Sequence, residues 1–148
     1  MKKFSYRLEK VLRFRKYLEK KAQKKLSDTI YEYQTRENLI KDIENKQKEL
    51  ASNCNKEKLR GMDVVRYQNY NLYSKKLFDD QERELVALKE TNESVQLHRS
   101  LLQKELIRKK QLEKLKEVQR SRYMQFAEKD EQKQSDETLI TIGKRVNL

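Results

Sequence analysis

The sequence of 148 residues contains no proline, no tryptophan and only two glycines, so few positions in it could break a helix. Only 35% of the residues are hydrophobic whereas 41% are charged, which excludes a globular core of ordinary size. The same balance is typical of disordered chains, but the lack of proline and a persistent helical period argue against disorder. We therefore expect a helical protein that buries its apolar side chains along a narrow line of contact.

Long apolar runs are also missing: near-apolar stretches are as short as residues 139–142, whereas a helix that crosses a bilayer needs about 18 apolar residues. The N-terminus begins with Lys2 and Lys3 but continues into a Lys/Arg-rich amphipathic segment, which is not the apolar core of a signal peptide. The single cysteine, Cys54, cannot form an internal disulfide, as is usual in a reducing compartment. These absences predict a cytoplasmic chain with no transmembrane segment.

Residues that carry chemistry are equally scarce. His98 is the only histidine, and no second histidine or cysteine stands near it to complete a metal site or a nucleophile and its base. No glycine-rich phosphate loop is present, and the neighbouring carboxylates Asp79 and Asp80 fall in an exposed helical segment without a pocket. We expect no enzymatic activity, no metal and no cofactor.

Apolar residues recur at steps of three and four through the first third of the chain, which predicts a helix over residues 5–52. Ser5 is a candidate N-cap for it. Arg15, Arg36 and Gln47 fill the positions that the apolar pattern skips. The apolar stripe consists of Leu8, Val11, Leu18, Ala22, Leu26, Ile30, Tyr33, Ile40, Ile43 and Leu50.

The pattern lapses between residues 53 and 63, which we interpret as a turn. Gly61 can take the left-handed conformation that ends a helix, and Asp63 suits the N-cap of the next one. A second stripe predicts a helix over residues 64–134, followed by a short or disordered tail over residues 135–148. Its members are Tyr67, Tyr70, Leu77, Gln81, Leu85, Leu88, Asn92, Val95, Leu102, Leu106, Leu112, Leu115, Gln119, Tyr123 and Phe126.

Two long helices joined by a short connection can bury their stripes on each other by folding back antiparallel. The predicted fold is all-α: one domain, residues 1–148, in which an antiparallel coiled-coil hairpin has its second helix overhanging the N-terminus. A turn near residue 57 would place residue i opposite about residue 114 − i. Polar Gln47, Gln81 and Asn92 fall on the predicted interface, where we expect them to specify the register.

The net charge of +12 is concentrated in two segments that face each other in this hairpin. Residues 1–26 carry eleven Lys/Arg against two acids, and residues 99–122 carry nine against three. Like-charged surfaces repel, so an isolated coiled coil gains nothing from this arrangement. We expect this end to dock on an electronegative partner; a merely solubilising surface is the alternative.

Nucleic acid or an anionic membrane surface is a rival partner, because phosphate binding needs little beyond Lys and Arg. However, no zinc-finger cysteines, basic fork or aromatic cluster on a sheet is visible. The tyrosines fall largely on or beside the predicted stripes, where packing explains them. We favour a protein partner, with a nucleic-acid or membrane binder and a bare structural spacer as alternatives.

Two sequence patterns, one near the start of each predicted helix, point more specifically to a protein family. They are Phe4-x-Tyr6-x-Leu8-Glu9-x-Val11-Leu12-x-x-Arg15-Lys16-x-x-Glu19 and Gly61-Met62-x-x-x-Arg66-Tyr67-x-x-Tyr70. In their order, their spacing and the chain length they resemble the FliJ family, a component of the flagellar type III export apparatus. The resemblance implies an antiparallel coiled coil similar to the γ-subunit stalk of rotary ATPases.

The same resemblance implies three partners: the ring of the export ATPase FliI, the cytoplasmic domain of the export gate FlhA, and the export chaperones. It implies a protein that links ring to gate, escorts or recycles chaperones, and is held through its partners at the inner membrane at the flagellar base. We expect a monomer when the chain is free.

The resemblance also assigns contact positions to the two ends of the hairpin. The basic residues expected on the ATPase ring, here called the ring-binding set, are Lys10, Arg13, Arg15, Lys16, Arg108, Lys109, Lys110 and Lys114. Matched by their spacing from the glycine, the gate-binding set near the turn is Leu39, Ile43, Leu50, Tyr73, Leu77, Asp80 and Glu84. Asp80 and Glu84 are acidic where an apolar or neutral contact would be expected, and the apolar members could equally serve packing.

Overall fold

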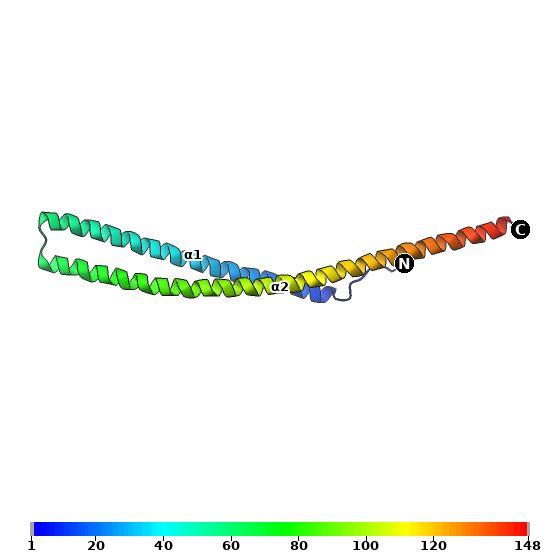
Figure 1. Ribbon diagram of the computed structural model, residues 1–148, viewed down its shortest axis with the longest axis horizontal. Coiled ribbons are helices and arrows are strands. Elements are labelled where there is room, and N and C mark those ends of the chain that lie inside the picture. Colours follow the sequence, from blue (N-terminus) through cyan, green and yellow to red (C-terminus); the bar gives the residue numbers. More distant parts are fainter. Residues whose placement is uncertain (1, 148) are drawn as a thin grey trace. The chain divides into compact units, whose positions relative to one another are not determined.

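The computed structural model describes residues 2–147, which form two helices, α1 (Glu9–Arg60) and α2 (Val64–Val146), joined by a three-residue turn (Figure 1). The helices are antiparallel and pack on each other, and residues 2–147 contain no strand, which confirms the all-α hairpin. The chain forms two compact units. The terminal unit extends up to Lys20 and from Gln103 onward, and the turn unit comprises Lys21–Leu102.

The turn is shorter and later than the sequence pattern predicts, because α1 continues through residues 53–60 and ends at Arg60. The polar residues there include neither glycine nor proline, so nothing in them breaks the helix. Gly61 has a φ of 91°, the left-handed conformation expected of it. The carbonyl of Asp63 accepts the N–H of Tyr67 at 3.0 Å, which makes Asp63 the N-cap residue of α2.

The displaced turn changes the pairing within the turn unit. A turn near residue 57 would put Arg36 opposite about residue 78 and Gln47 opposite about residue 67. Instead, Arg36 bonds to Glu84 at 3.2 Å, and the Gln47 amide donates to the Gln81 carbonyl at 3.1 Å. The estimated register was therefore wrong, whereas the prediction that Gln47 and Gln81 lie on the interface is confirmed.

Ile40, Leu77, Thr91 and Val95 are the buried residues of the turn unit. Thr91 takes the interface position predicted for Asn92, which is exposed. The Thr91 hydroxyl donates to the Ala87 carbonyl one turn earlier at 2.8 Å, so its burial leaves no unpaired polar group.

Charged side chains account for two of the other errors in the predicted stripe of α2. Leu85 and Leu115 are exposed, and their neighbours Glu84 and Lys116 lie in cross-helix ion pairs instead. An apolar pattern predicts the leucine at the interface, whereas the adjacent charged residue occupies that position because it is paired across the helices. Tyr67, Gln119 and Phe126, which were also predicted on the interface, are exposed.

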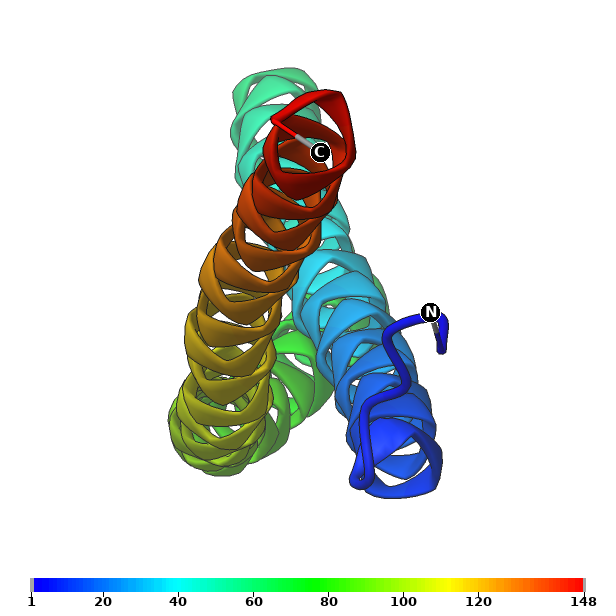
Figure 2. The ribbon, with the colours of Figure 1, turned by 90° about the vertical axis from the view of Figure 1, so that its right-hand side faces the viewer.

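In the terminal unit, α1 begins at Glu9 rather than at residue 5, because contacts with α2 hold the preceding residues in a non-helical conformation. The buried Tyr6 hydroxyl donates to the Leu112 carbonyl at 3.0 Å, and the Phe4 ring packs against Tyr123 with 5.6 Å between centroids. Figure 2 shows this segment beside the first turns of α1. Leu12 consequently takes the buried position, at 1% exposure, that the pattern assigns to Val11.

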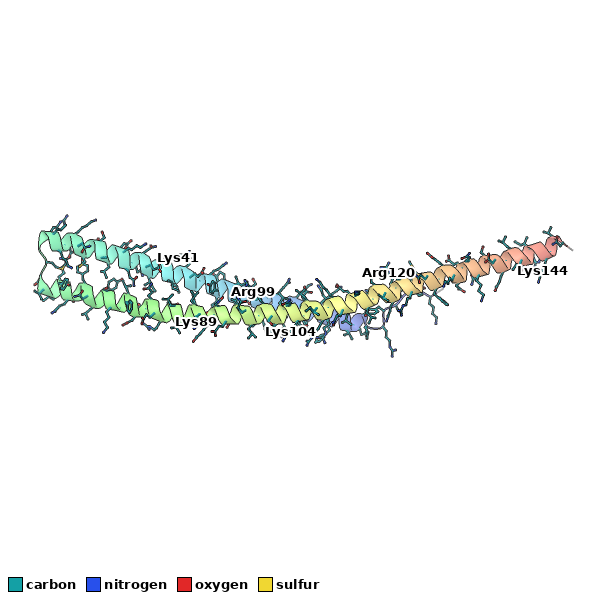
Figure 3. All side chains as sticks on the ribbon, in the orientation of Figure 1. Lys41, Lys89, Arg99, Lys104, Arg120 and Lys144 are labelled. Carbon is teal, nitrogen blue, oxygen red and sulfur yellow. The ribbon has the colours of Figure 1, made fainter. Side chains whose placement is uncertain are left out.

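The predicted tail is helical, because α2 continues to Val146. Gly143 is the weakest helix former in it and does not end the helix. Thr138 and Thr141 donate to the carbonyls of Gln134 and Glu137, each at 2.8 Å. Residues 131–142 are exposed throughout, and Figure 3 shows Lys144 in a part of α2 that no other segment accompanies.

Candidate protein-binding surfaces

Three ion pairs join α1 to α2 in the terminal unit, where two basic segments meet. Glu9 pairs with Lys116 at 2.8 Å, Glu19 with Lys109 at 2.6 Å, and Arg15 with Glu105 at 3.7 Å. Both acids that α1 contributes are thus placed against lysines of α2. These pairs offset the repulsion that the sequence predicts between the two segments.

The pairs also shift the ionisation of their members. A hydrogen bond from Lys116 lowers the pKa of Glu9 below its ordinary value of 4.5. A hydrogen bond to Glu19 raises the pKa of Lys109 above its ordinary value of 10.5. Both shifts favour the charged forms and so extend the pH range over which the helices attract each other.

The ring-binding set divides into residues that join the helices and residues that face solvent. Arg15 and Lys109 belong to the cross-helix pairs, and Arg108 pairs with Glu105 at 3.3 Å on its own helix. The exposed members without an acid partner among residues 2–147 are Lys10, Arg13, Lys16, Lys110 and Lys114.

Three of these exposed lysines lie around one shallow hollow of about 540 Å³. Its lining includes the buried Leu12 side chain and Arg120, a residue of α2 labelled in Figure 3 that the sequence did not single out. The hollow is lined by Leu12, Lys16, Lys110, Glu113, Lys114, Lys116, Glu117 and Arg120. The lining residues of α2 recur at steps of three and four up to Arg120, and this spacing is the sequence signal that could have identified Arg120.

The gate-binding set lies in the turn unit, and four of its seven members meet. Leu39, Ile43, Asp80 and Glu84 line a hollow of about 230 Å³ together with Arg83. Both carboxylates have partners, since Glu84 pairs with Arg36 and Asp80 with Arg83. The hollow is therefore lined by two apolar side chains, Leu39 and Ile43, and by charged groups whose charges are neutralised in ion pairs.

The three remaining members behave differently. Leu77 is 4% exposed and packs between the helices, so a partner could not reach it. Leu50 is half-buried, and Tyr73 is exposed.

Catalytic groups do not gather in the described part of the chain. Among residues 2–147 no group of His, Cys, Asp and Glu side chains could hold a metal ion. His98 and Cys54 are each half-buried. None of the described helices has an apolar stretch long enough to span a membrane.

Comparison with known proteins gives one match. A family model described as "Flagellar FliJ protein" matches residues 4–146. No curated protein and no solved structure matches the chain. The matched region includes both helices, the turn and every member of the ring-binding and gate-binding sets.

Proposed function

The chain belongs to the FliJ family, a non-catalytic component of flagellar protein export, and we propose that it acts as a coiled-coil stalk that docks on the FliI ATPase ring. Membership assigns it to flagellum biogenesis and motility. Beyond family membership, we propose three partners: the FliI ring, the gate protein FlhA and the export chaperones.

The observation that supports ring docking is the distribution of paired and unpaired charge in the terminal unit. Glu9, Glu19 and Glu105 are occupied by cross-helix pairs, whereas five members of the ring-binding set face solvent without an acid partner in the described chain. A surface of one sign attracts an oppositely charged partner at long range and orients it. We propose that these lysines and arginines meet an electronegative surface of the ATPase ring.

The turn unit supplies the second proposed contact. We assign the hollow formed by Leu39, Ile43, Asp80 and Glu84 to the cytoplasmic domain of the gate protein FlhA. Its two apolar side chains and its paired carboxylates suit a partner side chain that is apolar or weakly polar. We assign the exposed Tyr73 to the same contact, while Leu77 contributes packing only.

A protein that holds both partners links the ring to the gate. We propose that it does so in the cytoplasm at the inner membrane at the flagellar base, and that it escorts or recycles export chaperones. Family membership is the support for these last two steps.

Charge reversal tests the ring contact. Substitution of Lys10, Arg13, Arg108 and Lys110 by Glu should weaken binding to purified FliI by about tenfold or more, with the helical circular-dichroism signal retained. The matched control reverses four exposed lysines of the turn unit, Lys41, Lys46, Lys75 and Lys76, and so gives the same net charge. Unchanged binding in the first variant, or equal loss in both, would contradict docking through the terminal unit.

A further inference from the structure

The turn between α1 and α2, whose backbone Figure 1 shows, exposes apolar side chains that no packing within the turn unit explains. Leu59 is 89% exposed, Val64 68% and Val65 61%, and Met62 between them is half-buried. Single exposed apolar residues are common on protein surfaces, but three exposed apolar residues and the half-buried Met62 within seven residues at one turn form a patch. Such a patch usually marks a contact with another molecule.

Basic residues surround this patch on both helices. Lys56, Lys58 and Arg60 lie in the last turns of α1, and Arg66 lies in the first turn of α2. Residues 56–66 contain only two acids, and one of them, Glu57, pairs with Arg66 at 2.9 Å. The turn therefore combines an apolar tip with an excess of positive charge.

The two helix ends below the tip are held together. Glu57 of α1 accepts from Arg66 and also from Tyr70, whose pKa is raised by this hydrogen bond. The Lys58 ammonium lies 4.9 Å from the centroid of the Tyr67 ring. Together with the short turn closed by Gly61, these contacts restrain the apolar tip and so reduce the entropy that it loses on binding.

We propose that this turn inserts into the surface of an anionic lipid bilayer. Leu59, Val64 and Val65 would enter the boundary between headgroups and acyl chains, while Lys56, Lys58 and Arg60 contact lipid phosphates. A fluid bilayer accommodates a convex apolar tip, whereas a protein partner would need a matching pocket. The one-sided positive charge is complementary to an anionic leaflet. This contact goes beyond the proposed function, in which membrane association runs through protein partners.

Vesicle flotation tests the proposal with the full chain. Vesicles of equal parts phosphatidylglycerol and phosphatidylethanolamine should carry the wild-type protein, and phosphatidylcholine vesicles should not. Substitution of Leu59, Val64 and Val65 by Ser removes the apolar tip but keeps every charge, and should reduce binding by about tenfold. The matched control, Phe78, Val86 and Leu97 to Ser, removes exposed apolar residues elsewhere on α2 and should bind like the wild type.

A fluorescent probe separates insertion from electrostatic adhesion. An environment-sensitive dye on Val64→Cys, in a chain whose Cys54 is replaced by Ser, should shift to the blue on anionic vesicles, and a dye on Val86→Cys should not. Failure of the wild type to float, or an unshifted dye at position 64, would overturn the proposal. It would also be overturned if binding survived in the triple Ser variant but was lost in the terminal-unit charge reversal. That last result would assign the lipid contact to the basic residues of the terminal unit.

Discussion

Tyr6 shows how one side chain can decide where a helix begins. Its hydroxyl is buried and donates to the Leu112 carbonyl of α2 at 3.0 Å, a bond that Phe cannot make. We expect Tyr6→Phe to lower the free energy of unfolding by about 1 kcal/mol, measured by urea denaturation. The control Tyr17→Phe removes the hydroxyl of an exposed tyrosine and should change stability by less than about 0.5 kcal/mol. Equal effects in the two variants would contradict a role for the Tyr6 hydrogen bond.

Glu9 makes the stability of the terminal unit depend on pH at the acid end. Because Lys116 lowers the pKa of Glu9 below 4.5, its contribution is fully present above that value and is lost as the pH falls through the folded-state pKa. Lys109 has the opposite dependence, since its raised pKa gives a contribution present below pH 10.5 that is lost as the pH rises further.

Thermal unfolding at neutral pH and at about pH 3 measures the Glu9 contribution. Glu9→Gln should lower Tm at neutral pH and should narrow the difference in Tm between the two conditions. Glu93→Gln, at an exposed position of the turn unit, is the control and should leave that difference as in the wild type. If Glu9→Gln left the difference in Tm between the two pH values unchanged, the Glu9–Lys116 pair would be excluded as a source of the pH dependence.

At this scale the sequence predicts residue classes better than exact positions. Leu77 and Val95 were expected on the interface and are buried there. Interface positions held by Thr91, Glu84 and Lys116 could not be found from hydrophobicity, because they are accommodated by partners that only the folded chain brings together. The same applies to Arg120, which becomes part of a basic hollow only beside Lys16 of α1.

Replacement of the two glycines by alanine should have opposite effects, because Gly61 lies in the turn and Gly143 lies within α2. Gly61 has a φ of 91°, so Gly61→Ala forces a left-handed conformation on an L-residue and should destabilise the chain by about 1 kcal/mol. Gly143 lies within α2, and an added Cβ there meets no atom within 4 Å. Gly143→Ala should therefore raise the helical circular-dichroism signal slightly and should not lower Tm. If Gly61→Ala were neutral, the turn would not depend on the left-handed conformation.

Element type could be predicted from the sequence, but element ends could not. The lack of proline and the recurrence of apolar residues at steps of three and four were sufficient to predict two antiparallel helices. The end of α1 was placed early because residues 52–55 are polar, although polar residues alone do not stop a helix. Its start was placed early because Ser5 is a good N-cap, whereas the contact of Tyr6 with α2 overrides that local preference.

At the scale of the whole molecule, the terminal unit and the turn unit present different surfaces. The terminal unit carries unpaired lysines and arginines around its hollow, and the turn unit carries a smaller hollow in which Leu39 and Ile43 lie beside paired charges. Family membership places the chain in flagellar export, and two unlike surfaces in one family member are the basis for proposing two unlike partners.

Site-specific photo-crosslinking tests this assignment most directly. A benzophenone amino acid is placed at Lys110 in the terminal unit or at Tyr73 in the turn unit, both exposed, and each protein is irradiated with purified FliI and the FlhA cytoplasmic domain together. The assignment predicts that position 110 crosslinks to FliI and position 73 to FlhA. Crosslinking of FliI from position 73, or of FlhA from position 110, with equal or greater yield would contradict it.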